Sequence, residues 1–279
     1  MIFEFGKTDQ ANAFFDRNPK FYPAFERLMA LANRCYGRTI HAKSRAEDVC
    51  FDLGHTCRAD YLEILFLAVN GFGNGASKLL RGLYERAVAL AYIVKHPEKA
   101  ERFVRYAAIQ EYKALNAALN VVTEEQFDNA IGRTSAAKIR ELRDQVKPEF
   151  QVTLCKKCGH KGTAFSWDID VASMVHDVGD PYDKLYLGSY AIPNLHVHAT
   201  LASAFHGPDP DAELRRRQDD AERALRDATV ILILAIRCQN VLFEMNLDHE
   251  IETCERDFVD AVNRAAEKHA PSQASESEK

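Results

Sequence analysis

The sequence predicts an all-α protein, a single helical bundle-like domain over residues 1–270, with a short β-hairpin or knuckle near 150–165. Apolar residues recur at three- and four-residue steps through most of the chain, which is the spacing of a helix face. Capping signals also recur. In Ser44-Arg-Ala-Glu47 and Thr123-Glu-Glu-Gln126, an N-cap hydroxyl stands three residues before Glu or Gln. Both observations favour helices joined by short loops.

The composition is that of an ordinary globular protein, with 47% hydrophobic and 28% charged residues in a chain of 279. The net charge of −5 argues against a nucleic-acid footprint over the whole surface and leaves room for a local basic patch. The start of the chain has no basic region before an apolar run, and the longest apolar run, residues 228–236, is too short to span a membrane. Seven scattered cysteines indicate reduced thiols. We therefore expect a cytoplasmic protein with no membrane partner.

The sequence predicts a succession of helices whose ends are marked by proline, glycine and capping residues. The expected segments are 21–36 after a first short helix capped by Thr8, 44–72, 76–95, 98–120, a short helix after Thr123, 135–147, 170–178, one from 214 through 243, and a last one ending near 268. Residues 271–279 have the polar composition of a disordered tail.

The helix over 76–95 has a broad apolar face and only a narrow polar stripe. Arg81 and Glu85 lie on that stripe, four residues apart, and can pair. On a mostly buried helix each charge needs a partner. Two interpretations stay open at this point, namely a pair that ties helices together and a pair with a ligand-binding or catalytic role.

Residues 167–206 gather the richest set of polar and aromatic side chains. Tyr186 lies at helical spacing from two further tyrosines, and Pro193 fits the first turn of a new helix because it lacks an N–H. From Asn194, four-residue steps lead to His198 and then to His206. Asn194 can thus orient the His198 imidazole. We predict that Arg81, Glu85, Tyr186 and His198 form one contiguous cluster.

A metal-ligand spacing occurs in Cys155-Lys-Lys-Cys158-Gly-His160. Two thiolates separated by two residues and followed by Gly form the tight turn that tetrahedral zinc prefers. Zinc takes four ligands, and Cys50, His55 and Cys57 are the candidates to complete the set. The alternative is a surface loop with reduced cysteines and no metal.

The pieces Leu80-Arg81-Gly-Leu-Tyr-Glu85, Arg102-Phe-Val-Arg105-Tyr106, Trp167 and Tyr182…Tyr186…His198 resemble the bacterial helical family called domain of unknown function 5677. The similarity covers roughly residues 50–206. It implies an all-α fold and brings no established chemistry. It also implies that Arg81, Glu85 and His198 are the positions of functional interest.

More distantly, Asn194 and His198 resemble the polar residue and the histidine of HEPN domains, helical bundles that often act as dimeric RNases in toxin and phage-defence systems. The arginine of that signature is missing, because Pro193 occupies its position and no arginine lies between Arg143 and Arg215. The resemblance implies RNA as substrate and a homodimer. It also implies that either Arg81 or another arginine replaces the missing one in space, or that the site is inactive.

Two functional hypotheses follow from these residues. In the first, His198 removes a proton, Arg81 stabilises negative charge, and Tyr186 orients the substrate. In the second, the same side chains form a buried hydrogen-bond network in a non-catalytic helical module that binds a partner protein or a small ligand. Zinc at Cys155, Cys158 and His160 is the one cofactor that the sequence suggests.

Overall fold

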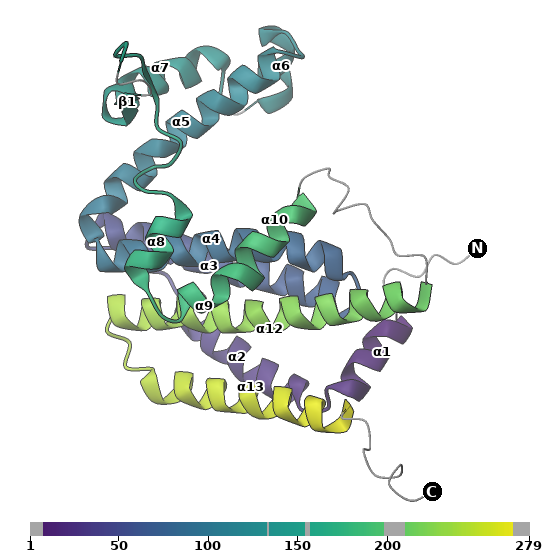
Figure 1. Ribbon diagram of the computed structural model, residues 1–279. Helices are drawn as coiled ribbons and strands as arrows, with labels where there is room; N and C mark the ends of the chain where they lie inside the picture. The colour runs from purple at the N-terminus through teal and green to yellow at the C-terminus, as the bar shows by residue number, and fades with distance from the viewer. Residues whose placement is uncertain (1–7, 133, 154–156, 198–209, 270–279) are drawn as a thin grey trace, which may run out of the picture. The chain divides into compact units, whose positions relative to one another are not determined.

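The computed structural model describes residues 8–132, 134–153, 157–197 and 210–269. Nearly all of its regular structure is helical, with one short antiparallel hairpin (Figure 1), so the predicted all-α fold with a hairpin near 150–165 is confirmed. The chain divides into two compact units. The first unit comprises residues 1–95 and 175–279, and the second unit comprises residues 96–174. A single domain over 1–270 stays a prediction, and the expected tail lies outside the described residues.

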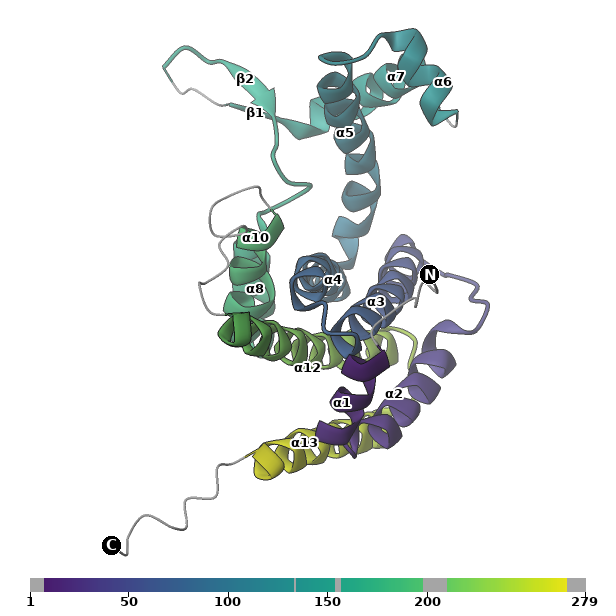
Figure 2. The same cartoon turned by 90° about the vertical axis from the view of Figure 1, so that its right-hand side faces the viewer.

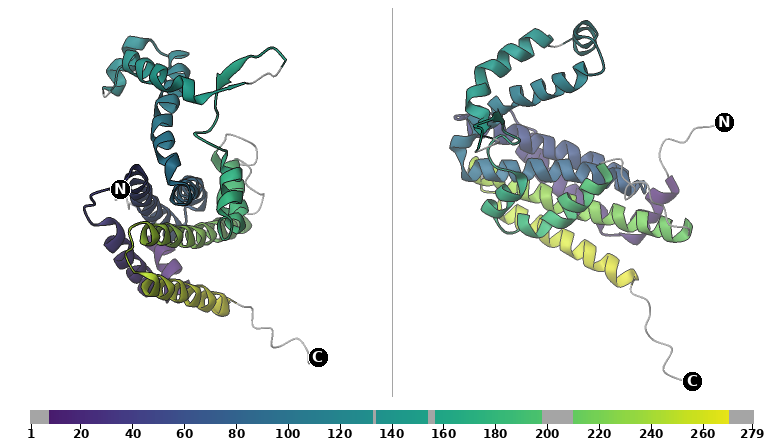
Figure 3. Two further views of the ribbon diagram at one scale, coloured as in Figure 1. Left: turned by 90° about the vertical axis from the view of Figure 1, so that its left-hand side faces the viewer. Right: turned by 45° about the horizontal axis from the view of Figure 1, so that its top comes forward.

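The first unit is built on three long helices, α3 (Arg45–Val69), α4 (Gly73–Lys95) and α12 (Pro210–Leu242). They pack against one another side by side (Figures 1 and 3). Their shared core holds fully buried side chains such as Tyr61 and Leu83. Burial of this apolar surface contributes most to the stability of the three-helix core. Among the described residues, no helix is both long and apolar enough to cross a membrane.

Helices α2 (Phe21–Tyr36) and α13 (Asp248–His269) pack against each other, and α1 (Thr8–Arg17) contacts α3 and α13. Ahead of α3, the Ser44 hydroxyl accepts a hydrogen bond from the Glu47 N–H at 3.2 Å, as the capping signal predicts. The local bond fixes where α3 begins.

Three short elements follow one another in the first unit and pack along α4. They are α9 (Tyr182–Tyr186), the π-helical turn η3 (Leu187–Ala191) and α10 (Ile192–Val197). Pro193 lies in the first turn of α10, as predicted, but α10 follows η3 without an intervening loop. A proline in a helix removes one hydrogen bond and its ring clashes with the carbonyl four residues earlier. The wider turn of η3, in which the Ile192 N–H bonds to the Leu187 carbonyl, accommodates it.

The second unit contains α5 (Ala100–Leu119), α6 (Glu124–Ile131) and α7 (Ala136–Val146). The capping box predicted at Thr123 is complete, with the hydroxyl and Gln126 each bonded to the other's backbone N–H. The remaining elements of this unit are η1 (Pro97–Lys99), η2 (Lys147–Phe150), β1 (Gln151–Thr153) and β2 (Lys161–Thr163), and α8 (Val171–Val178) contains the boundary with the first unit. Figure 2 shows β1 and β2 as a projecting hairpin.

Candidate functional site

The polar stripe of α4 carries an ion pair. Arg81 Nη2 lies 2.9 Å from Glu85 Oε1, the contact that their four-residue spacing predicts. Their side chains are 26% and 37% exposed, so the pair lies at the edge of the core and is neither sealed nor fully solvated. Arg86, the other arginine of this helix segment, turns instead to Asp60 of α3, with Nη1 and Oδ2 2.6 Å apart. Two adjacent turns of α4 thus present their charges to different neighbours.

Tyrosine rings surround this pair. The guanidinium carbon of Arg81 lies 5.3 Å from the centroid of the Tyr190 ring in η3, a cation–π arrangement. The Tyr84 ring, on the inner face of α4, lies 6.4 Å from Tyr186 and 6.1 Å from Tyr190, and those two rings are 5.2 Å apart. We name Arg81, Tyr84, Glu85, Tyr186 and Tyr190 the Arg81 cluster.

Tyr84 anchors the cluster from inside the core. Its hydroxyl donates a hydrogen bond to the Tyr182 carbonyl oxygen at 2.6 Å, and the residue is fully buried. Burial raises the pKa of the Tyr84 phenol, and the neighbouring Tyr186 and Asp183 raise it further. The phenol therefore stays protonated near neutral pH and acts as a donor that ties α9 to α4.

A carboxylate on α12 faces the same π-helical turn. Ser189 Oγ lies 3.5 Å from Asp227 Oδ2, and a Cβ placed on Gly188 would come within 3.0 Å of that oxygen. Burial raises the pKa of Asp227, while Arg226 and Arg223 on its own helix lower it in part. Sequence reasoning missed Asp227. Its signal is a single acidic residue at the start of the apolar run of α12.

The predicted site residues are only partly brought together. Arg81 and Glu85 are in contact, and Tyr186 joins them through Tyr84 and Tyr190. Asn194 is half-buried on α10, a helix that packs against α4. His198 lies outside the described residues, so its place in the cluster stays a prediction. The inner position of Tyr84 could have been found in the sequence, because it lies on the apolar side of α4.

The predicted metal ligands are not brought together among the described residues. Cys158 and His160 are exposed at the end of the β1–β2 hairpin, and Cys155 lies outside the described residues. Cys50 and Cys57 are buried in the first unit, and burial raises the pKa of both thiols, for Cys50 to about 12. Within the described ranges, no group of three or more metal-binding side chains gathers at one point. The zinc site stays a prediction.

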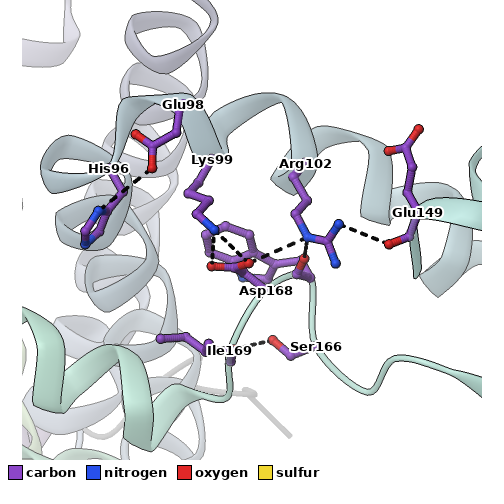
Figure 4. Close-up of polar contacts among 9 residues, drawn as sticks. His96, Glu98, Lys99, Arg102, Glu149, Ser166, Asp168 and Ile169 are labelled. Carbon is purple, nitrogen blue, oxygen red and sulfur yellow. Dashed lines mark hydrogen bonds and ion pairs between the residues drawn. The ribbon is translucent and has the colours of Figure 1, made fainter. Parts of the chain in front are cut away.

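Polar contacts in the second unit fix the base of the hairpin (Figure 4). Arg102 donates to two backbone carbonyls, from Nε to Trp167 at 2.6 Å and from Nη1 to Glu149 at 3.1 Å. Lys99 Nζ lies 3.1 Å from Asp168 Oδ2. Arg105 pairs with the Glu149 carboxylate. The motif Arg102…Arg105 therefore has a structural role, since it clamps the segments on either side of the hairpin to α5.

Comparison with known proteins decides the family. The model of the Family of unknown function (DUF5677) matches residues 55–213, more than half of the chain. The chain belongs to this family. The matched range of DUF5677 includes the Arg81 cluster and the hairpin of the second unit. No curated protein and no solved structure matches the chain.

Proposed function

We propose that this DUF5677 protein is a HEPN-like ribonuclease in which Arg81 replaces the arginine missing before His198. The observation that supports it is the position of the Arg81 guanidinium. It is held over the Tyr190 ring and remains 26% exposed, next to the helix that leads to His198. A fixed, partly accessible cation of this kind suits the negative charge that develops on a phosphate during cleavage.

The reaction would be an internal transesterification of the RNA backbone. His198 takes the proton of a ribose 2′-hydroxyl, the 2′-oxygen attacks the adjacent phosphorus, and the bond from phosphorus to the 5′-oxygen of the next nucleotide breaks. That oxygen takes a proton from water, His198 returns its own proton to the solvent, and the other product ends in a 2′,3′-cyclic phosphate. Arg81 stabilises the charged phosphate oxygens in the transition state.

The remaining residues would position these two groups. Glu85 holds the Arg81 side chain at 2.9 Å. Asn194 stands four residues before His198 and would orient its imidazole, and the Tyr186 hydroxyl would orient the substrate. We extend the proposal to a cytoplasmic homodimer that acts in toxin or phage-defence systems. Light scattering of the purified protein tests the dimer.

A second function is favoured by a different observation, the contacts that the cluster makes within the protein. Arg81 Nη2 is paired with Glu85 and the Tyr84 hydroxyl is bonded to the Tyr182 carbonyl, whereas Arg81 Nε is buried without a hydrogen-bond partner. In this alternative the cluster is structural, and the chain is a non-catalytic helical module that binds a partner protein or a small ligand.

One experiment separates the two functions. The purified full chain is incubated with labelled single-stranded RNA, and the products are examined for 2′,3′-cyclic phosphate ends. We expect His198→Ala and Arg81→Ala to abolish cleavage, with melting temperatures within a few degrees of the parent. His249→Ala, the same change at an exposed histidine of α13, serves as the matched control and should leave cleavage intact.

Two results contradict the ribonuclease. One is cleavage that persists in His198→Ala, which would come from a contaminant or another site. The other is a parent protein that cleaves no RNA, together with an Arg81→Ala protein that is less stable by about 1–3 kcal/mol. That combination supports the structural alternative. In cells, toxicity on expression that His198→Ala relieves would agree with the ribonuclease.

A further inference from the structure

We propose that the β1–β2 hairpin and the adjoining edge of α5 form a binding surface for single-stranded RNA, separate from the Arg81 cluster. The surface comprises Lys157, His160 and Lys161 on the hairpin, together with Phe165 and Lys113 at its base. In naming RNA, this proposal rests on the proposed function. It adds a second contact for the substrate, on the other unit of the chain.

The hairpin segment carries basic residues and no acidic ones, although the whole chain has a negative net charge. No Asp or Glu occurs between Glu149 and Asp168, whereas the whole chain has a net charge of −5. Lys157, His160 and Lys161 are all exposed. Lysines in a segment without carboxylates attract a phosphate backbone, and such contacts supply most sequence-independent affinity for nucleic acids. The charge of this element therefore suits a polyanion.

The hairpin is too small to contribute much to the stability of the fold. Each strand has three residues, with Thr153 paired to Lys161 and Gln151 to Thr163. All three side chains of β1 are exposed, so the strand buries nothing against a core. A lone two-stranded hairpin is at best marginally stable in water. Figure 2 and the left view of Figure 3 show it projecting from the helices of its unit.

Its base, in contrast, is firmly held. The Ala164 N–H bonds to the Phe150 carbonyl at 2.8 Å, and the Phe150 ring is fully buried beneath the Arg102 guanidinium, 4.5 Å from the ring centroid. Arg102 also bonds to the carbonyls of Glu149 and Trp167 (Figure 4). A rigid base with a polar, exposed end is the arrangement expected of an element that presents side chains to a ligand.

An aromatic ring completes the surface. Phe165 is 88% exposed, although its neighbours Ala164 and Trp167 are buried. Lys113 Nζ lies 5.9 Å from the centroid of the Phe165 ring and is itself fixed by hydrogen bonds to the Tyr106 hydroxyl at 2.9 Å and the Ala164 carbonyl at 3.0 Å. An exposed ring beside a fixed cation can stack an unpaired base while the cation meets its phosphate.

The combination identifies the ligand class. An acidic protein segment would use the lysines and leave the Phe165 ring without a partner. A membrane surface would need more apolar contact than one ring and the partly exposed Val152. A single RNA strand uses both features, because every base has a face that stacks and every nucleotide carries a phosphate. Lysine does not offer the bidentate geometry of arginine, so little sequence preference is expected.

The test measures binding apart from cleavage. The full chain carrying His198→Ala is titrated against a fluorescent short oligouridine, and the dissociation constant is followed by anisotropy at several salt concentrations. We expect Phe165→Ala to weaken binding about tenfold and Phe165→Tyr to retain most of the affinity. Because Phe165 is 88% exposed, neither change should affect folding.

The charge contribution is read from the salt dependence. Each lysine–phosphate contact on a single strand contributes about 0.7 to the slope of log K against log salt, so Lys157→Ala/Lys161→Ala should reduce the slope by about 1.4. The matched control is Lys20→Ala/Lys43→Ala, which removes the same charge from two exposed lysines of the first unit. Its slope should stay at the parent value.

The outcomes separate this proposal from the ribonuclease. Binding that weakens only in the hairpin and Phe165 variants supports the surface, even where the parent cleaves no RNA. Cleavage in the parent with unchanged affinity in those variants overturns the surface and leaves the ribonuclease standing. Competition by polyglutamate as strong as by RNA also overturns it, because the surface would then bind any acidic chain.

Discussion

The guanidinium carbon of Arg81 lies 5.3 Å from the centroid of the Tyr190 ring. The contact joins α4 to the π-helical turn η3, two elements far apart in sequence. It also explains how a charge is tolerated on an otherwise apolar helix, since the guanidinium lies over a ring and its Nη2 lies 2.9 Å from Glu85 Oε1.

We therefore predict measurable energetic coupling between Arg81 and Tyr190. In a double-mutant cycle of Arg81→Ala and Tyr190→Leu, urea unfolding should give a coupling free energy of about 0.5–1 kcal/mol, because the side chain is partly exposed and water weakens the attraction. A second cycle, with Arg81→Ala and Tyr22→Leu, is the control. Tyr22 is exposed on α2, where its ring contacts are Phe15 and Phe25, and no coupling is expected. Equal coupling in both cycles would contradict the contact.

Two glycines inside helices should respond oppositely to the same substitution. A Cβ on Gly54 of α3 would come within 2.6 Å of the Tyr36 ring and 2.9 Å of Gln239 Nε2, and both of those residues are buried. A Cβ on Gly82 of α4 would meet only the flexible end of Arg86, at 2.9 Å.

In urea unfolding, we expect Gly54→Ala to lower the free energy of unfolding by about 1–3 kcal/mol, because the core around it is already filled. Gly82→Ala should be neutral or stabilising by up to about 1 kcal/mol, since alanine favours the helix. A Gly54→Ala protein as stable as the parent would show that Tyr36 and Gln239 can move aside.

Local signals made most of the fold predictable. The hydroxyls of Ser44, Thr123 and Ser135 each accept a bond from the N–H three residues on, and α3, α6 and α7 begin where these caps place them. Caps and the pairing of Arg81 with Glu85 depend on residues within one turn of helix, and such interactions can be seen in a sequence.

The candidate site was less predictable, because its remaining contacts join distant parts of the chain. Tyr84 reaches a carbonyl 98 residues away, and Asp227 reaches Ser189 over 38 residues. No spacing rule connects such positions. The π-helical turn η3, which precedes Pro193 and joins α9 to α10, was not predicted, because a proline in a sequence signals either a helix start or a distortion within a longer helix. Packing against α4 and α12 decides between these outcomes.

The hairpin gives a prediction about metal. Cys155, Cys158 and His160 supply three ligands, one fewer than structural zinc takes, and no Asp or Glu lies between Glu149 and Asp168 to provide the fourth. We expect protein purified under reducing conditions without chelator to contain well under one zinc per chain by elemental analysis. One equivalent of zinc that is lost in Cys155→Ser would contradict this and would mean that another part of the chain completes the site.

Asp227 yields a prediction about pH. Its side chain is 14% exposed, and burial raises its pKa above the value of about 3.9 expected in the unfolded chain. Ser189 Oγ at 3.5 Å and Arg226 Nε at 3.6 Å favour the charged form, as does Arg223, but burial outweighs them. The folded state therefore holds the proton more tightly than the unfolded state. This contribution to stability is present below the unfolded pKa and is lost as the pH rises through the folded pKa.

Asp227→Asn should consequently raise the free energy of unfolding at pH 7, where the parent must keep a carboxylate partly buried, and the gain should shrink as the pH falls toward 4. The amide can still accept a hydrogen bond from Ser189, so little is lost in exchange. Urea unfolding at both pH values measures the difference. Asp219→Asn makes the same chemical change at an exposed position of α12 and should show no such pH-dependent gain. A less stable Asp227→Asn protein at pH 7 would mean that attraction to Arg223 and Arg226 outweighs the cost of burial.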